Sequence, residues 1–192
     1  MYVNLALLAV LVVVGVASAR GGLLQGMAMF FNVLVAASFA TAWCGPLAEF
    51  LRPFFEPYAN FLEVAAAWLL FTLILAVLAT ATSQLLKAKV PFVRPVELAG
   101  RVLVGLVTGW TAAEFTALTI HTAPLMSDVV PMPPQRSMLF GLKPDRCWLW
   151  WVRGSSRNGP FAVPGQPFDP EKDFIERHAA WREELSGGPP PR

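Results

Sequence analysis

Residues Glu97 to Ala123 read ELAGRVLVGLVTGWTAAEFTALTIHTA, and this stretch decides the fold. Between Val102 and Ile120 nearly every residue is apolar, small, or a hydroxyl that can bond its own backbone. About 20 such residues span the hydrocarbon core of a bilayer, so the stretch predicts a transmembrane helix. The chain as a whole has 55% hydrophobic residues, 15% charged residues and a mean hydropathy of +0.52. This composition is typical of a membrane protein and too apolar for an ordinary soluble domain.

Two features of this helix point to what surrounds it. Gly105 and Gly109 lie four residues apart, hence on one helical face, where a neighbouring backbone can approach closely. We therefore expect this face to pack on a partner helix. Glu114 lies inside the apolar stretch, where an unpaired carboxylate costs about 3 kcal/mol on insertion scales. It should face the bundle interior or stay protonated, either as a functional group or as a carboxyl bonded to Asn32 or to a threonine hydroxyl.

The first apolar run, Val3 to Ala19, ends at Arg20 and is about 17 residues long, at the short end of the spanning range. The triplet Ala17-Ser18-Ala19 resembles a signal-peptidase site, so a cleaved signal peptide is the alternative to a retained helix. The leader before the run lacks the Lys or Arg that a signal peptide usually carries, which favours a retained helix.

The second run extends from Leu23 to about Cys44. Gly22 and Gly26 are four residues apart and predict a second helix-packing face. Asn32 lies near the middle of the membrane, where we expect an interhelical hydrogen bond, the alternative being the polar lining of a pore. A third run from Phe61 to about Leu86 brings the number of predicted crossings to four.

The loops predict how these helices sit in a membrane. Gly45-Pro46 indicates the end of the second helix, and the segment to Asn60 combines prolines and aromatics in a way typical of an interfacial loop. Two short loops lie on the side opposite this interfacial loop, and they contain Arg20, Lys87, Lys89 and Arg94. Because positive residues mark the cytoplasmic side, these short loops should be cytoplasmic. The sequence therefore predicts an all-α membrane protein. Four antiparallel transmembrane helices would occupy residues 1–123, with both termini outside.

Residues 124–192 predict a polar tail. Of the 15 basic and 13 acidic residues, 11 lie in residues 1–125 and 17 in the shorter remainder. A Pro-rich linker leads to the run Cys147–Val152, which indicates a strand or an interfacial segment rather than a ligand site. Asp169-Pro170 predicts the start of an amphipathic helix over about 170–185. We expect the buried face of this helix to consist of Phe174, His178, Trp181 and Leu185. Gly187-Gly188 should end the helix, and Pro189 to Arg192 should be disordered.

The chain offers little recognisable chemistry. Cys44 and Cys147 lie on the same predicted outer side, and the sequence leaves open whether they form a disulfide or stay free thiols. His121 and His178 lack metal-ligand spacing, so we expect no metal and no other cofactor. Without a phosphate-binding loop, a nucleophile elbow or a zinc-protease motif, no catalytic residue is assigned and no enzyme is expected. A formal charge of +2 without a basic run gives no reason to expect nucleic acid as a partner.

The arrangement resembles the colicin V production protein family over residues 3–122. The resemblance lies in four crossings, the turn Arg20-Gly21, small residues along the second helix, and the glycines Gly105 and Gly109. Glu97 stands for an acidic residue usual in that family, while Arg101 replaces a glycine and Thr108 replaces an arginine. The resemblance implies an inner-membrane protein connected with colicin V production or export, or with envelope homeostasis, and without enzymatic activity.

Two functional hypotheses follow, and a third, an intramembrane enzyme, rests only on Glu114. The first is a non-enzymatic accessory protein that acts through its helix faces and tail, with the lipid bilayer around it and a second copy or another membrane protein as partner. The second is a small oligomeric channel or transporter in which Glu114, Asn32 and Gln25 line a polar route.

Overall fold

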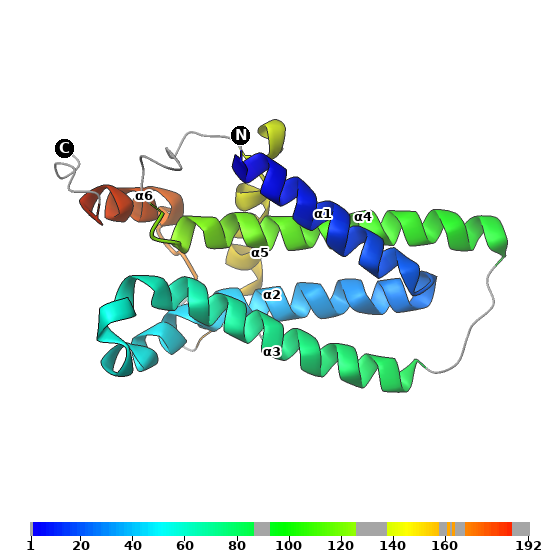
Figure 1. The fold of residues 1–192 in the computed structure, drawn as a ribbon, viewed down its shortest axis with the longest axis horizontal. Coiled ribbons are helices and arrows are strands. Elements are labelled where there is room, and N and C mark those ends of the chain that lie inside the picture. The colour runs from blue at the N-terminus through cyan, green and yellow to red at the C-terminus, as the bar shows by residue number, and fades with distance from the viewer. Residues whose placement is uncertain are drawn as a thin grey trace.

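The computed structural model describes residues 2–86, 93–125, 138–157, 161, 163 and 168–185. Four long helices lie along the longest dimension of the molecule, and the chain reverses direction from each to the next (Figure 1). They are α1 (Tyr2–Arg20), α2 (Leu23–Leu51), α3 (Leu62–Leu85) and α4 (Arg94–Thr122). All four are long and apolar enough to cross a membrane, as the sequence predicts. Lys87, Lys89, most of the Pro-rich linker and the tail after Leu185 lie outside the described residues.

The pairing of α1 with α4 depends on glycine at the crossing. A Cβ atom built on Gly109 would lie 2.2 Å from the Leu11 carbonyl oxygen, and one built on Gly105 would lie 2.7 Å from the Gly15 carbonyl oxygen. Real Cβ contacts are never this short, so the two backbones are closer than any larger residue permits. The predicted glycine face of α4 therefore packs on α1, whose own Gly15 faces Gly105.

Polar contacts also join α1 to α4, near the α1–α2 turn. Ser18 Oγ lies 3.3 Å from Thr108 Oγ1, and Arg101 Nε donates a hydrogen bond to the Ala19 carbonyl oxygen over 2.8 Å. Inside a membrane bundle such bonds satisfy groups that lipid cannot. Gly22 in the turn has a φ of +94°, a conformation that a residue with a side chain rarely adopts.

The second helix is longer than expected. It continues past Gly45 and Pro46 to Leu51, whereas the sequence suggests an end at Cys44. Proline removes only one backbone hydrogen bond, and Leu47 and Ala48 beyond it pack against the main buried cluster. This packing offsets the helix-breaking effect. The remainder of the expected interfacial loop forms two short helical turns, η1 (Arg52–Phe54) and η2 (Glu56–Phe61).

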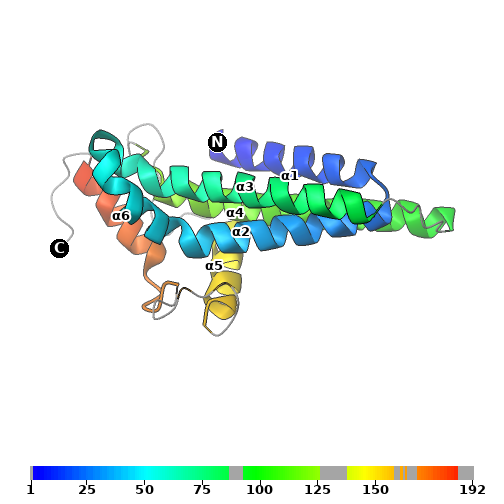
Figure 2. The same ribbon diagram turned by 90° about the horizontal axis from the view of Figure 1, so that it is seen from below.

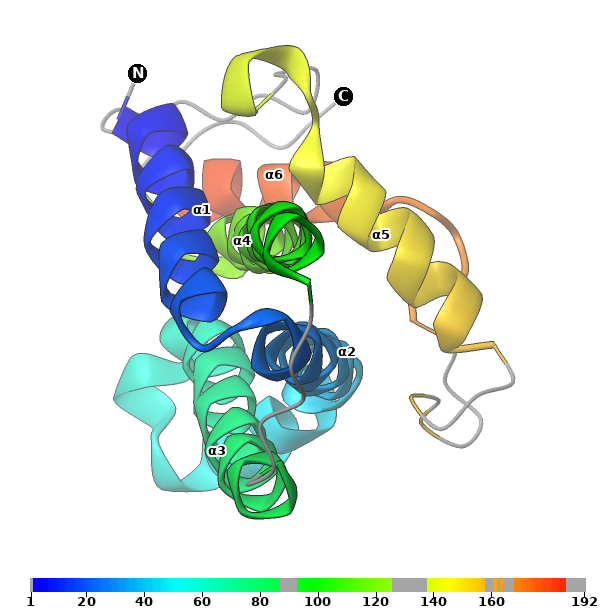
Figure 3. The same ribbon diagram turned by 90° about the vertical axis from the view of Figure 1, so that its right-hand side faces the viewer.

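The remaining described elements lie beside the start of α1 and the end of α4. They are η3 (Leu139–Gly141), α5 (Pro144–Ser155) and α6 (Phe174–Leu185), and we call residues 138–157 and 168–185 the cap. The α5 helix runs crosswise to the four long helices (Figures 1, 2 and 3). The alternative of a strand over Cys147–Val152 is therefore wrong, because the run lies within the α5 helix. Trp148, Leu149 and Val152 lie on one side of a helix and are each 1% exposed or less, because that side is covered by the bundle.

The last helix begins at Phe174, four residues later than expected. Asp169 and Lys172 have φ values of +47° and +63°, which a right-handed helix excludes. Its buried residues are also rotated from the expected set: Leu185 is 47% exposed, whereas Ile175, Ala179 and Arg182 are buried. Packing between α6 and the bundle decides which side is covered.

Candidate functional site

Hydrogen bonds and ion pairs attach the cap to the bundle. Two indole groups of α5 attach it to α2. Trp148 Nε1 donates a hydrogen bond to Thr41 Oγ1 and Trp151 Nε1 donates one to Ser38 Oγ, each over 3.0 Å. The Trp148 ring also meets the edge of Phe115 in α4, with ring centroids 6.2 Å apart. A buried tryptophan needs a partner for its N–H, and the two hydroxyls of α2 supply one for each ring.

A buried ionisable pair joins the end of α4 to the start of α5. His121 Nε2 lies 3.2 Å from Asp145 Oδ2, and the two side chains are 4% and 2% exposed. Arg182 of α6 donates a hydrogen bond to the His121 carbonyl oxygen over 2.5 Å. Burial lowers the pKa of the Arg182 guanidinium, while the nearby Glu183 carboxylate acts in the opposite direction. One cluster therefore connects α4, α5 and α6.

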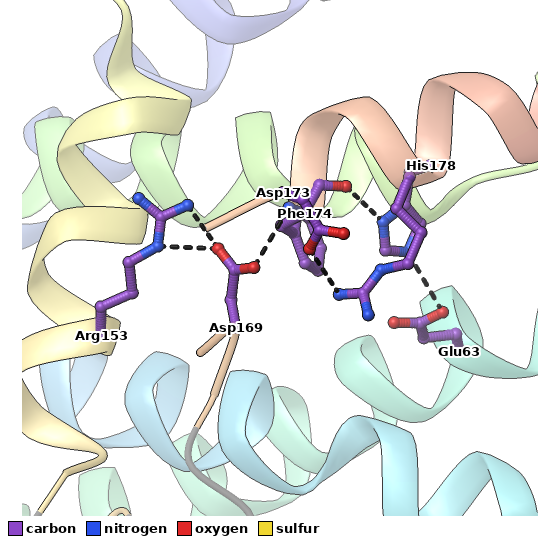
Figure 4. A network of polar contacts seen from close by, with 7 residues as sticks. Glu63, Arg153, Asp169, Asp173, Phe174 and His178 are labelled. Atoms are coloured by element: carbon purple, nitrogen blue, oxygen red, sulfur yellow. Dashed lines mark hydrogen bonds and ion pairs between the residues drawn. The ribbon is translucent and has the colours of Figure 1, made fainter. Parts of the chain in front are cut away.

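Asp169 connects α5 to the first residue of α6, as Figure 4 shows. Its carboxylate accepts hydrogen bonds from the guanidinium of Arg153 in α5, including one from Nε over 2.7 Å. Its other oxygen accepts a hydrogen bond from the Phe174 backbone N–H over 3.1 Å. The expected N-cap residue thus does cap the helix, but from five positions before the N–H it binds, because the intervening residues form a turn.

His178 connects α6 to α3 (Figure 4). Its Nδ1 lies 2.7 Å from the Phe174 carbonyl oxygen, which can only accept, so Nδ1 carries a hydrogen. Its Nε2 lies 3.5 Å from Glu63 Oε2. The contact therefore joins α6 to the start of α3.

A cavity of about 560 Å³ lies between α6, the end of α2 and the start of α3. This volume is in the range of small-molecule sites. Its polar lining includes Glu49, Arg52, Glu63, Arg177 and His178. The walls also carry aromatic and apolar side chains, namely Leu62, Phe168, Phe174 and Trp181. The lining can therefore donate and accept hydrogen bonds and can offer charges of both signs.

Glu114 lies elsewhere. Its Oε1 accepts a hydrogen bond from Trp110 Nε1, one helical turn earlier, over 2.6 Å. The expected partners, Asn32 or a threonine hydroxyl, are not the ones that Glu114 binds. Desolvation raises the pKa of the Cys147 thiol in α5, and the charges of Glu114 and Asp145 raise it further.

Asn32 donates a hydrogen bond to Thr82 Oγ1 of α3 over 2.9 Å, the interhelical bond that we expected. It also lines a cavity of about 210 Å³, together with Gln25 and Ser18. Glu114 does not belong to this lining. The structure therefore brings together two of the three residues of the hypothetical polar route and leaves the third apart.

The other residues singled out from the sequence fall in separate places. Gly22 forms the α1–α2 turn, and a Cβ on Gly26 would lie 3.4 Å from the Ser18 carbonyl oxygen and from Val104. Cys44 is a buried free thiol and Cys147 an exposed one. Within the residues that the structure describes, no group of three His, Cys, Asp or Glu is placed to hold a metal.

The site contains residues that sequence reasoning missed. Glu63, Arg153 and Asp145 carried no pattern that linked them to their partners, because those partners lie far away in the chain or across a turn. One pairing had a local signal: Trp110 and Glu114 are four residues apart, the spacing at which side chains on a helix meet.

The described part of the chain thus defines a class: a helical protein with four helices suited to cross a membrane and a cap docked at one end. No protein-family model, no curated protein and no solved structure matches the chain. The resemblance to the colicin V production family stays an expectation based on the residues quoted above.

Proposed function

We propose that the protein is a multi-pass protein of a bacterial inner membrane, with α1–α4 as an antiparallel transmembrane bundle and both termini outside. Residues 1–123 would form the membrane domain and residues 124–192 the outer tail. Four apolar helices support the crossings. Arg20 at the α1–α2 turn and Arg94 and Arg101 at the start of α4 lie at the end opposite the cap, which supports the orientation.

We further propose that the protein acts as a non-enzymatic accessory in toxin production or export, or in envelope homeostasis, as the family resemblance implies. The observation that carries this proposal is the docking of the cap: Trp148 and Trp151 are hydrogen-bonded to α2, and His121 and Asp145 join α4 to α5. A cap fixed at this many points presents a defined surface to a partner, which is either another membrane protein or a second copy.

Two experiments test the proposal. A membrane-impermeant maleimide added to intact cells should label the exposed Cys147, in a Cys44→Ala background, only if the cap is outside. Labelling only after cell lysis would overturn the orientation. For the partner, a photo-reactive residue in place of Arg177, at the rim of the large cavity, should capture a discrete species in native membranes. The matched control is the same residue at the lipid-facing Val13. A solitary monomer at both positions would contradict an accessory role.

The channel hypothesis has one observation in its favour, the polar cavity at Gln25 and Asn32. Flux measured in liposomes separates the alternatives. If a route uses this cavity, Asn32→Leu should reduce flux. If the route uses Glu114, Glu114→Gln should reduce it, and absence of flux in the unmodified protein would remove the hypothesis.

A further inference from the structure

We infer that α5 lies in the plane of the membrane at its outer surface, with its exposed face in contact with lipid and its cations toward anionic headgroups. The inference rests on the proposed bundle orientation and adds a lipid-binding surface to it.

The depth of α5 follows from α1. At about 1.5 Å per residue, the 19 residues of α1 extend about 28 Å, close to the thickness of the hydrocarbon core. One end of α1 therefore lies near each edge of that core. The Leu139 backbone N–H, just before α5, donates a hydrogen bond to Asn4 Oδ1 over 3.0 Å. Leu139 also belongs to a buried cluster with Leu7. The start of the cap thus lies at the level of the outer end of α1.

The other helices place α5 at the same level. Counting 19 residues, the length of α1, from Leu23 at the start of α2 reaches Thr41. Thr41 accepts the hydrogen bond from Trp148. Along α4, the close contacts pair Gly105 with Gly15 and Gly109 with Leu11.

The α4 pairing runs in opposite directions along the two helices, so Tyr2 lies opposite approximately Leu118. That position is between Phe115, which contacts Trp148, and His121, which contacts Asp145. The contacts on α1, α2 and α4 therefore all place α5 at the edge of the hydrocarbon core.

The direction of α5 suits that position. In all three views it runs crosswise to the long helices (Figures 1, 2 and 3). If the long helices follow the membrane normal, α5 lies along the surface. Helices in this position carry aromatic or aliphatic side chains toward lipid and Lys or Arg toward headgroups.

The exposed face of the segment has this composition. Trp150 is 77% exposed, Phe140 is 72% exposed and Leu142 is 60% exposed. Lys143 is exposed beside them.

The carboxylate of the segment 138–157 is turned inward. Asp145 is 2% exposed and pairs with His121. The exposed charged side chains of this described segment are therefore cations. Among possible occupants, an anionic lipid surface fits both the exposed aromatic rings and the charge, and the depth of α5 places that surface beside it.

The test is a depth measurement on the full-length protein reconstituted in phosphatidylcholine vesicles, alone or mixed equally with phosphatidylglycerol. A nitroxide spin label on Cys147 in a Cys44→Ala background reports collisions with oxygen, which concentrates in lipid, and with a water-soluble nickel chelate. Two references in a Cys44→Ala and Cys147→Ser background calibrate it: Val13→Cys, on the exposed middle of α1, and Glu183→Cys, on the exposed side of α6.

The label on Cys147 should give collision rates between those of the two references, corresponding to a position within about 5 Å of the headgroup boundary. Phosphatidylglycerol should shift it further toward the Val13→Cys value. Lys143→Glu should abolish that shift, while Lys172→Glu, at another exposed lysine with positive φ, should preserve it.

The outcomes are distinguishable. Collision rates at Cys147 equal to those at Glu183→Cys would mean that α5 faces water and would overturn the inference. Low collision rates with both reagents would mean that protein covers the face, a second copy or another partner, and would overturn it too. If Val13→Cys itself behaved as an aqueous site, the proposed bundle orientation would fail.

Discussion

Replacing Gly109 by alanine should separate α1 from α4. The added Cβ would lie 2.2 Å from the Leu11 carbonyl oxygen and 3.1 Å from the Gly15 backbone nitrogen. Ordinary van der Waals contact begins at 3.4 Å, so α1 has to move by about 1 Å along this direction. The obstructing atoms belong to the backbone and cannot rotate away. Overpacking of a core costs about 1–3 kcal/mol, and we place Gly109→Ala at the upper end.

The matched control is Gly45→Ala. A Cβ at Gly45 meets nothing within 4 Å, so this variant gains the higher helix propensity of alanine without a clash. The difference in free energy of unfolding between the two variants should be about 3 kcal/mol. Gly105→Ala, with its closest contact at 2.7 Å, should fall between them.

Reversible unfolding in mixed micelles of dodecylmaltoside and SDS measures these free energies. The unmodified protein, Gly45→Ala, Gly105→Ala and Gly109→Ala would be compared under one set of conditions. Equal stability of Gly109→Ala and Gly45→Ala would refute the close approach of the two backbones. Any order of destabilisation other than Gly109→Ala above Gly105→Ala above Gly45→Ala would contradict the close contacts as well.

Three further predictions concern side-chain contacts. A double-mutant cycle of Asn32→Ala and Thr82→Ala should give a coupling of about 0.6–2 kcal/mol in the same assay, and additive effects would argue against their hydrogen bond. Asp145→Ala leaves a buried histidine without its partner, so it should destabilise the docked cap by about 1–3 kcal/mol, seen as faster proteolysis after α4; unchanged cleavage would count against the pair. Because the pKa of the Cys147 thiol is raised, less thiolate exists near neutral pH, and its alkylation should be slower than that of the unfolded chain and should need a higher pH to reach its maximum. Glu114→Gln should lower that pKa and speed the reaction, and an unchanged rate would mean that no charge on Glu114 reaches Cys147.

The long helices were predictable because their signal is local. An apolar run long enough to cross a bilayer has few alternatives to a helix, since every backbone polar group must be satisfied within the segment. The spacing of Gly105 and Gly109 also predicts a close neighbour. It does not say that the neighbour is α1 with Gly15, because that choice depends on how the whole chain packs.

The cap was much less predictable. The run Cys147–Val152 is too short for its period to distinguish a strand from a helix, and the hydroxyls that bind its indoles lie more than 100 residues earlier. The pairing of His178 with Glu63 spans 115 positions. Proline at position 46 indicated a helix end by its local chemistry, and contacts made by the residues after it outweighed that signal.

The four long helices differ in length: α1 has 19 residues, whereas α2 and α4 have 29 each. In the proposed arrangement α1 has no residues beyond those needed to span the hydrocarbon core, so it becomes too short when the bilayer is thicker. The longer helices still span a thicker hydrocarbon core, but α1 does not. The bilayer around α1 must become locally thinner, or α1 must change its tilt. Its tilt is fixed by the glycine crossing with α4, so hydrophobic mismatch would act first on that crossing, and the protein should be most stable in thin membranes.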